Sequence, residues 1–188
     1  MSRSLGFAPA AFGLLLTSSP ARAESLIKHP GRHPDYTFEA EPHFMFGFDP
    51  PGDRAGRGYG PGFRGTVELV DNGFISSINN TIGIGFGLDW LFYGEHCIGR
   101  GPGPRDCHDH DRIILPVVMQ WNFWLSRNWS VFGEPGITLN FRDNHDDSDV
   151  DFDPFTFYAG GRFHFNDAIA LTMRIGYPTF SVGASFFL

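Results

Sequence analysis

Imidazole and carboxylate side chains gather in two polar stretches of this chain, and both groups are ordinary metal ligands. The first stretch is Cys107-His108-Asp109-His110-Asp111, and the second, 142–153, carries His145 and six aspartates. The alternating aspartates resemble the start of a calcium loop. Pro154 follows them, however, without the turn glycine or the distant glutamate that such a loop needs. We therefore expect solvated polar loops, and neither a metal site nor a bound cofactor.

The only two cysteines, Cys97 and Cys107, lie close together in the chain. Nine residues, 98–106, separate them, and that stretch is rich in glycine and proline. An even number of cysteines in an exported chain predicts a disulfide between them. The alternative is a pair of thiol ligands that joins His108 and His110 at a metal, which an oxidising compartment disfavours.

The parts of a hydrolytic site are present, but no motif unites them. Acyl hydrolysis needs a nucleophile, a base within hydrogen-bond reach and a group that orients the base. Side chains that could supply these roles fall on possible inward faces: His43, His164, Ser181, Ser185, Glu39 and Glu134. The sequence shows neither a His-x-Ser signature nor a nucleophile elbow. We expect no catalytic residues and no enzyme, and an outer-membrane hydrolase remains the third alternative.

The first 23 residues have the layout of a secretory signal peptide. Arg3 gives a modest positive start, Leu5 to Leu16 is an apolar run, and Ala21-Arg22-Ala23 is a small-x-small cleavage site. We therefore divide the chain into a cleaved signal, 1–23, and one mature domain, 24–188. Glu24 would be the first mature residue, where a lipid anchor would need cysteine.

Acidic residues outnumber basic residues by 21 to 14, which gives a formal net charge of −7. Cleavage of the signal would remove two arginines and no acid, so the mature chain would be still more acidic. A chain without a basic field cannot neutralise many phosphates. We therefore expect no nucleic-acid partner.

The stretch 78–93 shows most clearly the kind of element that must position these side chains. Every second residue from Ile82 to Phe92 is large and apolar, whereas the residues between them are mostly glycine. A period of two predicts a β-strand with two different faces. A glycine face suits a narrow lumen crowded by other side chains better than it suits a solvated surface. The strand therefore favours a barrel with its apolar face outward.

The same alternation predicts eight strands in all. Their ranges are 36–48, 62–70, 78–93, 112–125, 129–141, 155–165, 168–177 and 179–188. Long polar connections, 49–61, 94–111 and 142–153, follow the first, third and fifth strands, and tight turns follow the fourth and sixth. Aromatic residues gather near both ends of the apolar faces. An even number of strands, long loops at one end and two aromatic girdles are typical of outer-membrane barrels.

The C-terminus is similar to the β-signal that the outer-membrane assembly machinery reads. Its residues are Phe180, Val182, Ala184, Phe186 and Leu188. The family pattern ends in Phe or Trp, whereas this chain ends in Leu188 with Phe187 before it. The whole mature chain resembles the small OmpA/OmpX-like barrels in strand number, loop alternation and length. That resemblance implies an all-β, eight-stranded, antiparallel up-and-down transmembrane barrel, and it carries no catalytic motif.

Charged side chains fall on the faces that alternation turns inward. They are Glu39, Glu41, Arg64, Glu68, Asp89, Glu134, Arg162 and Arg174. An eight-stranded barrel is only wide enough to be filled by side chains, so these charges have to pair with one another. We expect an ion-pair plug and not a conducting pore.

Taken together, the residues predict a monomeric, non-enzymatic outer-membrane barrel of structural or surface-interaction type. Its outer loops would be acidic and held by the Cys97–Cys107 disulfide. A small gated channel of the porin kind is the second alternative. The partners expected are outer-membrane lipid, lipopolysaccharide and the assembly machinery, and the location is the outer membrane of a Gram-negative envelope.

Overall fold

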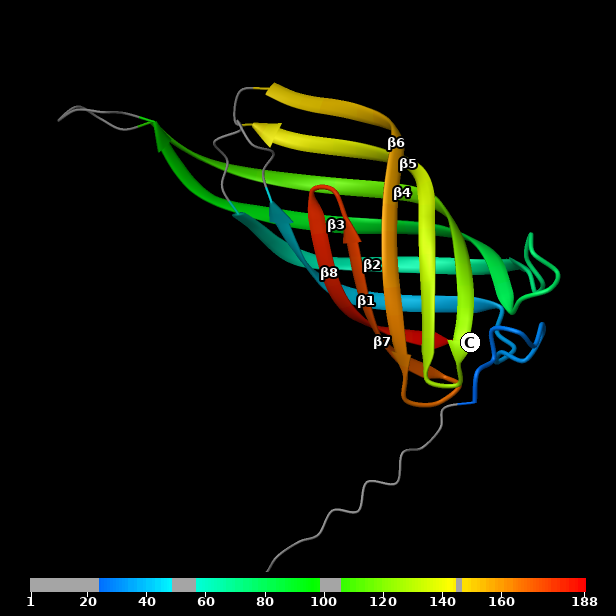
Figure 1. Cartoon of the computed structure of the whole chain (residues 1–188). Helices are drawn as coiled ribbons and strands as arrows, with labels where there is room; N and C mark the ends of the chain where they lie inside the picture. Colours follow the sequence, from blue (N-terminus) through cyan, green and yellow to red (C-terminus); the bar gives the residue numbers. More distant parts are fainter. Residues whose placement is uncertain (1–23, 49–56, 99–105, 145–146) are drawn as a thin grey trace, which may run out of the picture.

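The computed structural model describes residues 24–48, 57–98, 106–144 and 147–188, and the predicted signal peptide lies outside them. Its strands form one closed antiparallel barrel in chain order, in which β1 also pairs with β8 (Figure 1). The strands are β1 (Phe38–Phe48), β2 (Arg57–Val70), β3 (Asn80–Ile98), β4 (Asp106–Ser126), β5 (Trp129–Asn144), β6 (Asp147–His164), β7 (Ile169–Gly176) and β8 (Thr179–Phe187). The described part of the chain contains no helix that is long and apolar enough to cross a bilayer.

The barrel carries its apolar side chains on the outside. Exposed and buried residues alternate along the whole of β7, and on β3 the outward Ile84, Phe86 and Leu88 are 46, 47 and 51 % exposed. The inward Asp89, next on β3, is fully buried. Polar groups inside and apolar groups outside reverse the arrangement of a water-soluble protein and match a barrel that faces lipid. This confirms the two-faced strands that the alternation predicted.

Glycines on the inward face of β3 leave room for side chains of the neighbouring strands. A Cβ atom added at Gly87 would lie 2.7 Å from Nε of Arg64, and one added at Gly85 would lie 2.9 Å from a methyl carbon of Val118. Both separations are shorter than two such atoms tolerate. The glycine face is therefore what allows large inward side chains from β2 and β4 to fill the lumen.

Several strands run farther than the sequence predicted. β3 and β4 remain paired out to Ile98 and Asp106, and β5 and β6 remain paired out to Asn144 and Asp147. The expected loops 94–111 and 142–153 were therefore too long, as was 49–61, since β2 starts at Arg57. Antiparallel pairing is made by backbone groups, so it continues where the side chains no longer alternate between apolar and polar.

The N-terminal segment, 24–37, lies against the end of the barrel where the chain also terminates (Figure 1). The amide of Leu26 donates to the carbonyl oxygen of Leu125 at 2.9 Å, and the amide of Asn79 donates to that of Ile27 at 2.8 Å. The amide of Thr37 donates to Leu188 at 2.7 Å. We call this the inner end, and we call the opposite end, to which β3–β6 extend, the outer end.

Two apolar clusters fill the lumen near its two ends. Toward the outer end, Met45, Leu91, Tyr93 and Ile114 pack together. Toward the inner end, Trp124 packs with Ala170 and Phe187, and Tyr36 of the N-terminal segment lies against them. The charged side chains of the lumen lie between these clusters.

Candidate functional site

Six strands deliver charged side chains to the middle of the lumen. Because these residues occupy inward positions of the alternation, each is at most 3 % exposed. They are Glu39 and Glu41 on β1, Arg64 on β2, Asp89 on β3, Glu134 on β5, Arg162 on β6 and Arg174 on β7. We call these seven residues, with His43 of β1, the lumen ion network.

Glu134 is shared by two guanidinium groups. Nε of Arg174 donates to its Oε2 at 2.9 Å, and Nη1 of Arg64 donates to the same oxygen at 3.2 Å. Arg174 also binds Glu41 through two parallel hydrogen bonds of 2.7 and 2.8 Å. Charge-assisted bidentate pairs of this kind are among the strongest hydrogen bonds in proteins. These contacts tie β5 to β2, β7 and β1.

A second group of contacts lies closer to the inner end. Nη2 of Arg162 donates to Oε2 of Glu39 at 2.8 Å, and its Nη1 donates to Oδ1 of Asn122 at 2.6 Å. The hydroxyl of Ser185 donates to the other oxygen of Glu39 at 2.6 Å. Gln120 joins the two groups, since it donates to Glu134 at 2.9 Å and accepts from Asn122 at 3.0 Å.

Toward the outer end, the network finishes in a carboxylate, an imidazole and a guanidinium group. Nε2 of His43 lies 2.9 Å from Oδ1 of Asp89, and Nη2 of Arg64 lies 3.5 Å from Oδ2 of the same carboxylate. Nδ1 of His43 is 3.6 Å from Glu41. The imidazole of His43 therefore lies between the carboxylates of Glu41 and Asp89. The network as a whole contains four carboxylates and three guanidinium groups.

Sequence reasoning placed Glu68 in the lumen with the other charges. The structure keeps it on the inward face, opposite Gly83 of β3, but at the inner mouth and apart from the lumen ion network. Glu68 lies near the inner end of β2, beside His33 of the N-terminal segment, and makes none of the described lumen ion pairs. The register of β2 against β3 shifts between Glu68 and Val70. The residue left without a register partner is Leu69, so Glu68 itself keeps the inward direction that alternation predicts, and only its distance from the other charges was not foreseen.

Gln120 and Asn122 are neutral side chains that bind charged members of the network, and the sequence predicted only that they face inward. Gln120 and Asn122 alternate with outward residues of β4, but their amides could not be assigned to particular charges. Phe132 also takes part, because the guanidinium carbons of Arg162 and Arg174 lie 4.1 and 5.1 Å from its ring centre. Such cation–π contacts help to hold a buried positive charge.

One Ser–His pair in the lumen bears on the hydrolase alternative. Oγ of Ser130 lies 2.8 Å from Nε2 of His164, and both side chains are buried. Nδ1 of His164 has no hydrogen-bond partner among the described residues, so no carboxylate orients the ring. A hydrolytic triad needs that orienting group and an open path for the substrate. The pair as described lacks the first of these.

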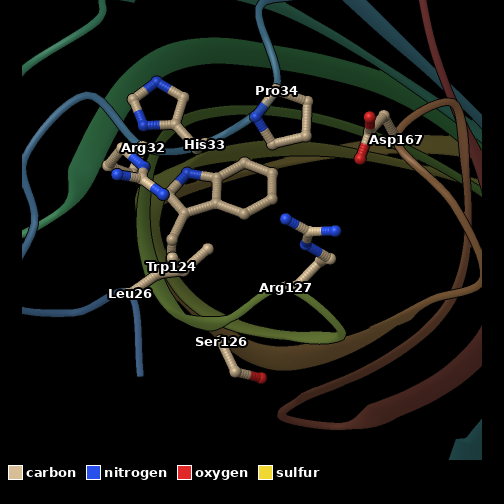
Figure 2. Close-up of a pocket in the computed structure, with 8 residues that line it drawn as sticks. All are labelled: Leu26, Arg32, His33, Pro34, Trp124, Ser126, Arg127 and Asp167. Atoms are coloured by element: carbon tan, nitrogen blue, oxygen red, sulfur yellow. The ribbon is translucent and has the colours of Figure 1, made fainter. Parts of the chain in front are cut away.

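A pocket of about 240 Å³ opens at the inner end, between the N-terminal segment and the β4–β5 and β6–β7 turns. Figure 2 shows the indole of Trp124 among its labelled side chains, which include His33, Arg127 and Asp167. The ring of His33 stacks on that indole at 5.4 Å. Nearby, burial raises the pKa of the Tyr36 phenol well above its usual value, which keeps its hydroxyl protonated. The N-terminal segment thus packs into the mouth of the barrel.

The remaining predicted residues lie at the two edges of the barrel. The register places Cys97 of β3 opposite Cys107 of β4, while their side chains fall outside what the structure describes. The residues of the expected assembly signal alternate along β8 and its end, where Phe186 and Leu188 are 39 and 71 % exposed. Those side chains face outward from the barrel.

No family model and no curated protein sequence matches this chain. Two solved structures of Ail, the attachment invasion locus protein of Yersinia pestis, do match the fold. The structure in complex with the heparin analogue sucrose octasulfate has a TM-score of 0.51, and the second has a TM-score of 0.50. Each is 12 % identical and covers 83 % of this chain and 99 % of its own. Identity this low shows likeness of fold.

The fold is that of a small outer-membrane β-barrel, and the OmpA/OmpX-like architecture implied by the sequence is confirmed. The apolar outer face of the strands fits that location, because it would otherwise be exposed to water. Fold alone leaves the activity open. The function must therefore be argued from the lumen and the outer end.

Proposed function

We propose that this chain is a structural or surface-interaction barrel of the Gram-negative outer membrane. Its partner would bind to the outer parts of β3–β6, which we call the outer sheet. The free edge of β6 is the observation that carries this proposal. The filled lumen supports it, because a packed ion network between two apolar clusters leaves little room for a ligand or a water path. Lipid and lipopolysaccharide surround the apolar outer face, and the chain acts as a monomer.

The outer parts of β3–β6 extend beyond the short hairpin of β7 and β8 (Figure 1). β6 begins at Asp147, whereas its pairing with β7 begins only at Tyr158. Within the described chain, 147–157 therefore pairs with β5 on one side and has an open edge on the other. An open edge offers unpaired backbone groups to which an extended peptide can add as a further strand.

Charge restricts the kind of peptide that would fit this edge. The open edge, 147–157, contains four aspartates and no basic residue, so it attracts a basic segment. The Ail structure mentioned above holds a heparin analogue, which is a polyanion. The acidic edge of the present chain would repel such a ligand, so we expect a basic, extended partner in its place.

A disulfide between Cys97 and Cys107 would hold the neighbouring hairpin. Residues directly opposite each other on antiparallel strands have Cα atoms about 4.5–5.5 Å apart, which falls within the span of about 4.4–6.8 Å that disulfides bridge. The register of β3 and β4 supports this pairing. The bond would fasten the outer end of the β3–β4 hairpin and so stiffen the sheet to which β6 belongs.

The proposal also includes the two ends of the precursor. The signal peptide, 1–23, would direct export and be removed. The outward residues from Phe180 to Leu188 would be read by the assembly machinery as the chain enters the membrane. All five occupy the outward face of the last strand and its end, which supports this role because one partner could contact them together.

Peptide binding to the refolded mature barrel tests the proposal. We expect an alternating Lys-Val decapeptide to bind and an alternating Glu-Val decapeptide not to bind. Val150→Lys, on the open strand, should weaken Lys-Val binding more than Phe141→Lys. The two residues are register partners, so both changes add the same charge at the same height, but Phe141 lies on a strand that is paired on both sides.

Equal loss of binding in the two variants would mean that charge alone and not the strand edge accounts for recognition. Binding of neither peptide would contradict the proposed partner. Conductance in planar bilayers tests the channel alternative, and we expect the wild-type protein to be silent. A large, steady conductance would overturn the filled lumen and favour the channel.

A further inference from the structure

Three side chains with metal-binding groups meet at the inner end, outside the lumen ion network. His33, Glu68 and Asp71 each present one ligand atom, and these atoms lie within 4.8 Å of one another. His33 belongs to the N-terminal segment, Glu68 to the end of β2, and Asp71 to the β2–β3 connection. The cluster therefore joins the segment that covers the barrel mouth to the wall of the barrel.

His33 is held in the orientation that metal-binding histidines adopt. Its side chain is 1 % exposed, and its ring stacks on Trp124 (Figure 2). Nδ1 donates a hydrogen bond to Oδ1 of the buried Asn79 at 2.6 Å. Such a bond from the second ring nitrogen typically orients a histidine that binds metal through the first. Nε2 is left to face Asp71, whose Oδ1 lies 2.9 Å away.

Glu68 provides an independent indication that a ligand belongs here. Its Oε2 atom is buried and has no hydrogen-bond partner among the described residues. A buried carboxylate oxygen without a partner is costly. An ion pair between His33 and Asp71 alone would leave Oε2 of Glu68 without a partner. A cation between the three side chains would satisfy Glu68 as well.

We propose that His33, Glu68 and Asp71 bind one zinc ion, which fastens the N-terminal segment across the inner mouth of the barrel. Two carboxylates balance the charge of a divalent cation. Calcium binds six to eight oxygen atoms and magnesium requires a nearly octahedral oxygen shell, whereas an imidazole with carboxylates suits zinc. Three protein ligands and one water complete the usual tetrahedral shell. Asp71, whose side chain is 67 % exposed, leaves the solvent side open for that water.

The site has a mechanical consequence for the inner end. The N-terminal segment is otherwise held by backbone hydrogen bonds, such as those of Leu26 and Ile27, and by the packing of its buried side chains at the barrel mouth. A zinc ion would add bonds from this segment to both β2 and the β2–β3 connection. The segment should therefore stay closed over the mouth when zinc is bound and open more often when zinc is removed.

Calorimetry with zinc chloride on the refolded mature barrel tests the binding. We expect one saturable site that Glu68→Gln and Asp71→Asn each weaken by more than about tenfold, since even second-shell changes often cost about 10–100-fold. His29→Ala is the matched control, because His29 is exposed on the same segment, and it should leave this site unchanged. Heat from zinc bound at other histidines, such as His108 and His110, should be the same in the wild type and in all variants. Equal affinity in wild type and both carboxylate variants, or no saturable heat, would overturn the proposal.

Limited trypsin digestion supplies a second readout. Lys28 and Arg32 are exposed on the N-terminal segment, and cleavage after either residue requires that segment to open. We expect zinc to slow this cleavage at least about fivefold relative to chelator in the wild type, and calcium to have no such effect. Glu68→Gln, which keeps the size of the side chain, should remove the difference. Heat-modifiable gel mobility verifies that each variant is folded. Equal cleavage rates of the wild type in zinc and in chelator would refute the clamp.

Discussion

Replacing Glu134 with alanine removes the carboxylate that Arg64 and Arg174 share. Glu134 is fully buried and accepts hydrogen bonds of 3.2 and 2.9 Å from these two guanidinium groups. Removing one partner of a buried ion pair costs about 3–5 kcal/mol, because the other charge stays buried. Arg174 keeps its bidentate contact with Glu41. Arg64 keeps Asp89, at 3.5 Å, and the ring of Tyr158, whose centre lies 5.2 Å from its guanidinium carbon. Because both arginines keep other contacts, we expect Glu134→Ala to reduce the free energy of unfolding by an amount in the lower half of that range.

Two further variants separate charge from packing. Glu134→Gln keeps the size of the side chain and some hydrogen bonds, so it should cost less than the alanine change. Thr138→Val is the matched control on the same inward face of β5. The Thr138 hydroxyl is buried without a hydrogen-bond partner among the described residues, so its removal should change stability by less than about 0.5 kcal/mol.

Urea unfolding in lipid vesicles, followed by tryptophan fluorescence, measures these differences. Heat-modifiable gel mobility checks that each variant has folded before the titration. Planar-bilayer recordings of the same proteins should show that Glu134→Ala conducts more than the silent wild type, if loosened arginines admit water. A Glu134→Ala barrel that matches the wild type in both stability and conductance would refute the network as the structure holding the lumen closed.

The remaining predictions concern the lipid face, the outer hairpin and the inner aromatic cluster. Leu171→Arg places a charge on the lipid side and should lower the free energy of unfolding by about 2–4 kcal/mol in the same assay. Thr172→Arg, which faces the lumen, should act through lumen packing instead. An unchanged stability of the Leu171→Arg barrel would contradict the face assignment. Cys97 and Cys107 should resist alkylation until they are reduced, and labelling of the native protein would exclude the disulfide. Trp124→Ala should cost about 3–5 kcal/mol by loss of a buried ring, and a loss below about 1 kcal/mol would show that the inner cluster is loosely packed.

The barrel itself could be predicted from local patterns. Outward Ile84, Phe86 and Leu88 alternate with inward glycines, and a period of two assigns each residue to a face without knowledge of the partner strand. The inward position of Glu134 follows in the same way. Arg64, Arg162 and Arg174 were its candidate partners, but the sequence could not choose among them, because pairing across the lumen depends on the register of strands that are far apart in sequence.

Other features depend on contacts that leave no local signal. The extension of β6 to Asp147 rests on backbone pairing through a run of aspartates, which resembles a solvated loop in sequence. The separation of Glu68 from the other inward charges depends on its position at the inner mouth, beside the N-terminal segment. The N-terminal segment closes on Trp124, and only the presence of that large ring at an inward position could have suggested that something covers it.

Two ion pairs and one hydrogen bond of β1 join residues that are far apart in the chain. Arg162 and Glu39 are 123 residues apart, Arg174 and Glu41 are 133 apart, and Ser185 and Glu39 are 146 apart. None of these contacts can form before β1 meets β8, so each should be absent from any transition state that precedes closure. Contacts made only after the transition state slow unfolding and leave the folding rate nearly unchanged. The charged interior should therefore slow the unfolding of the closed barrel without increasing the rate at which the barrel folds.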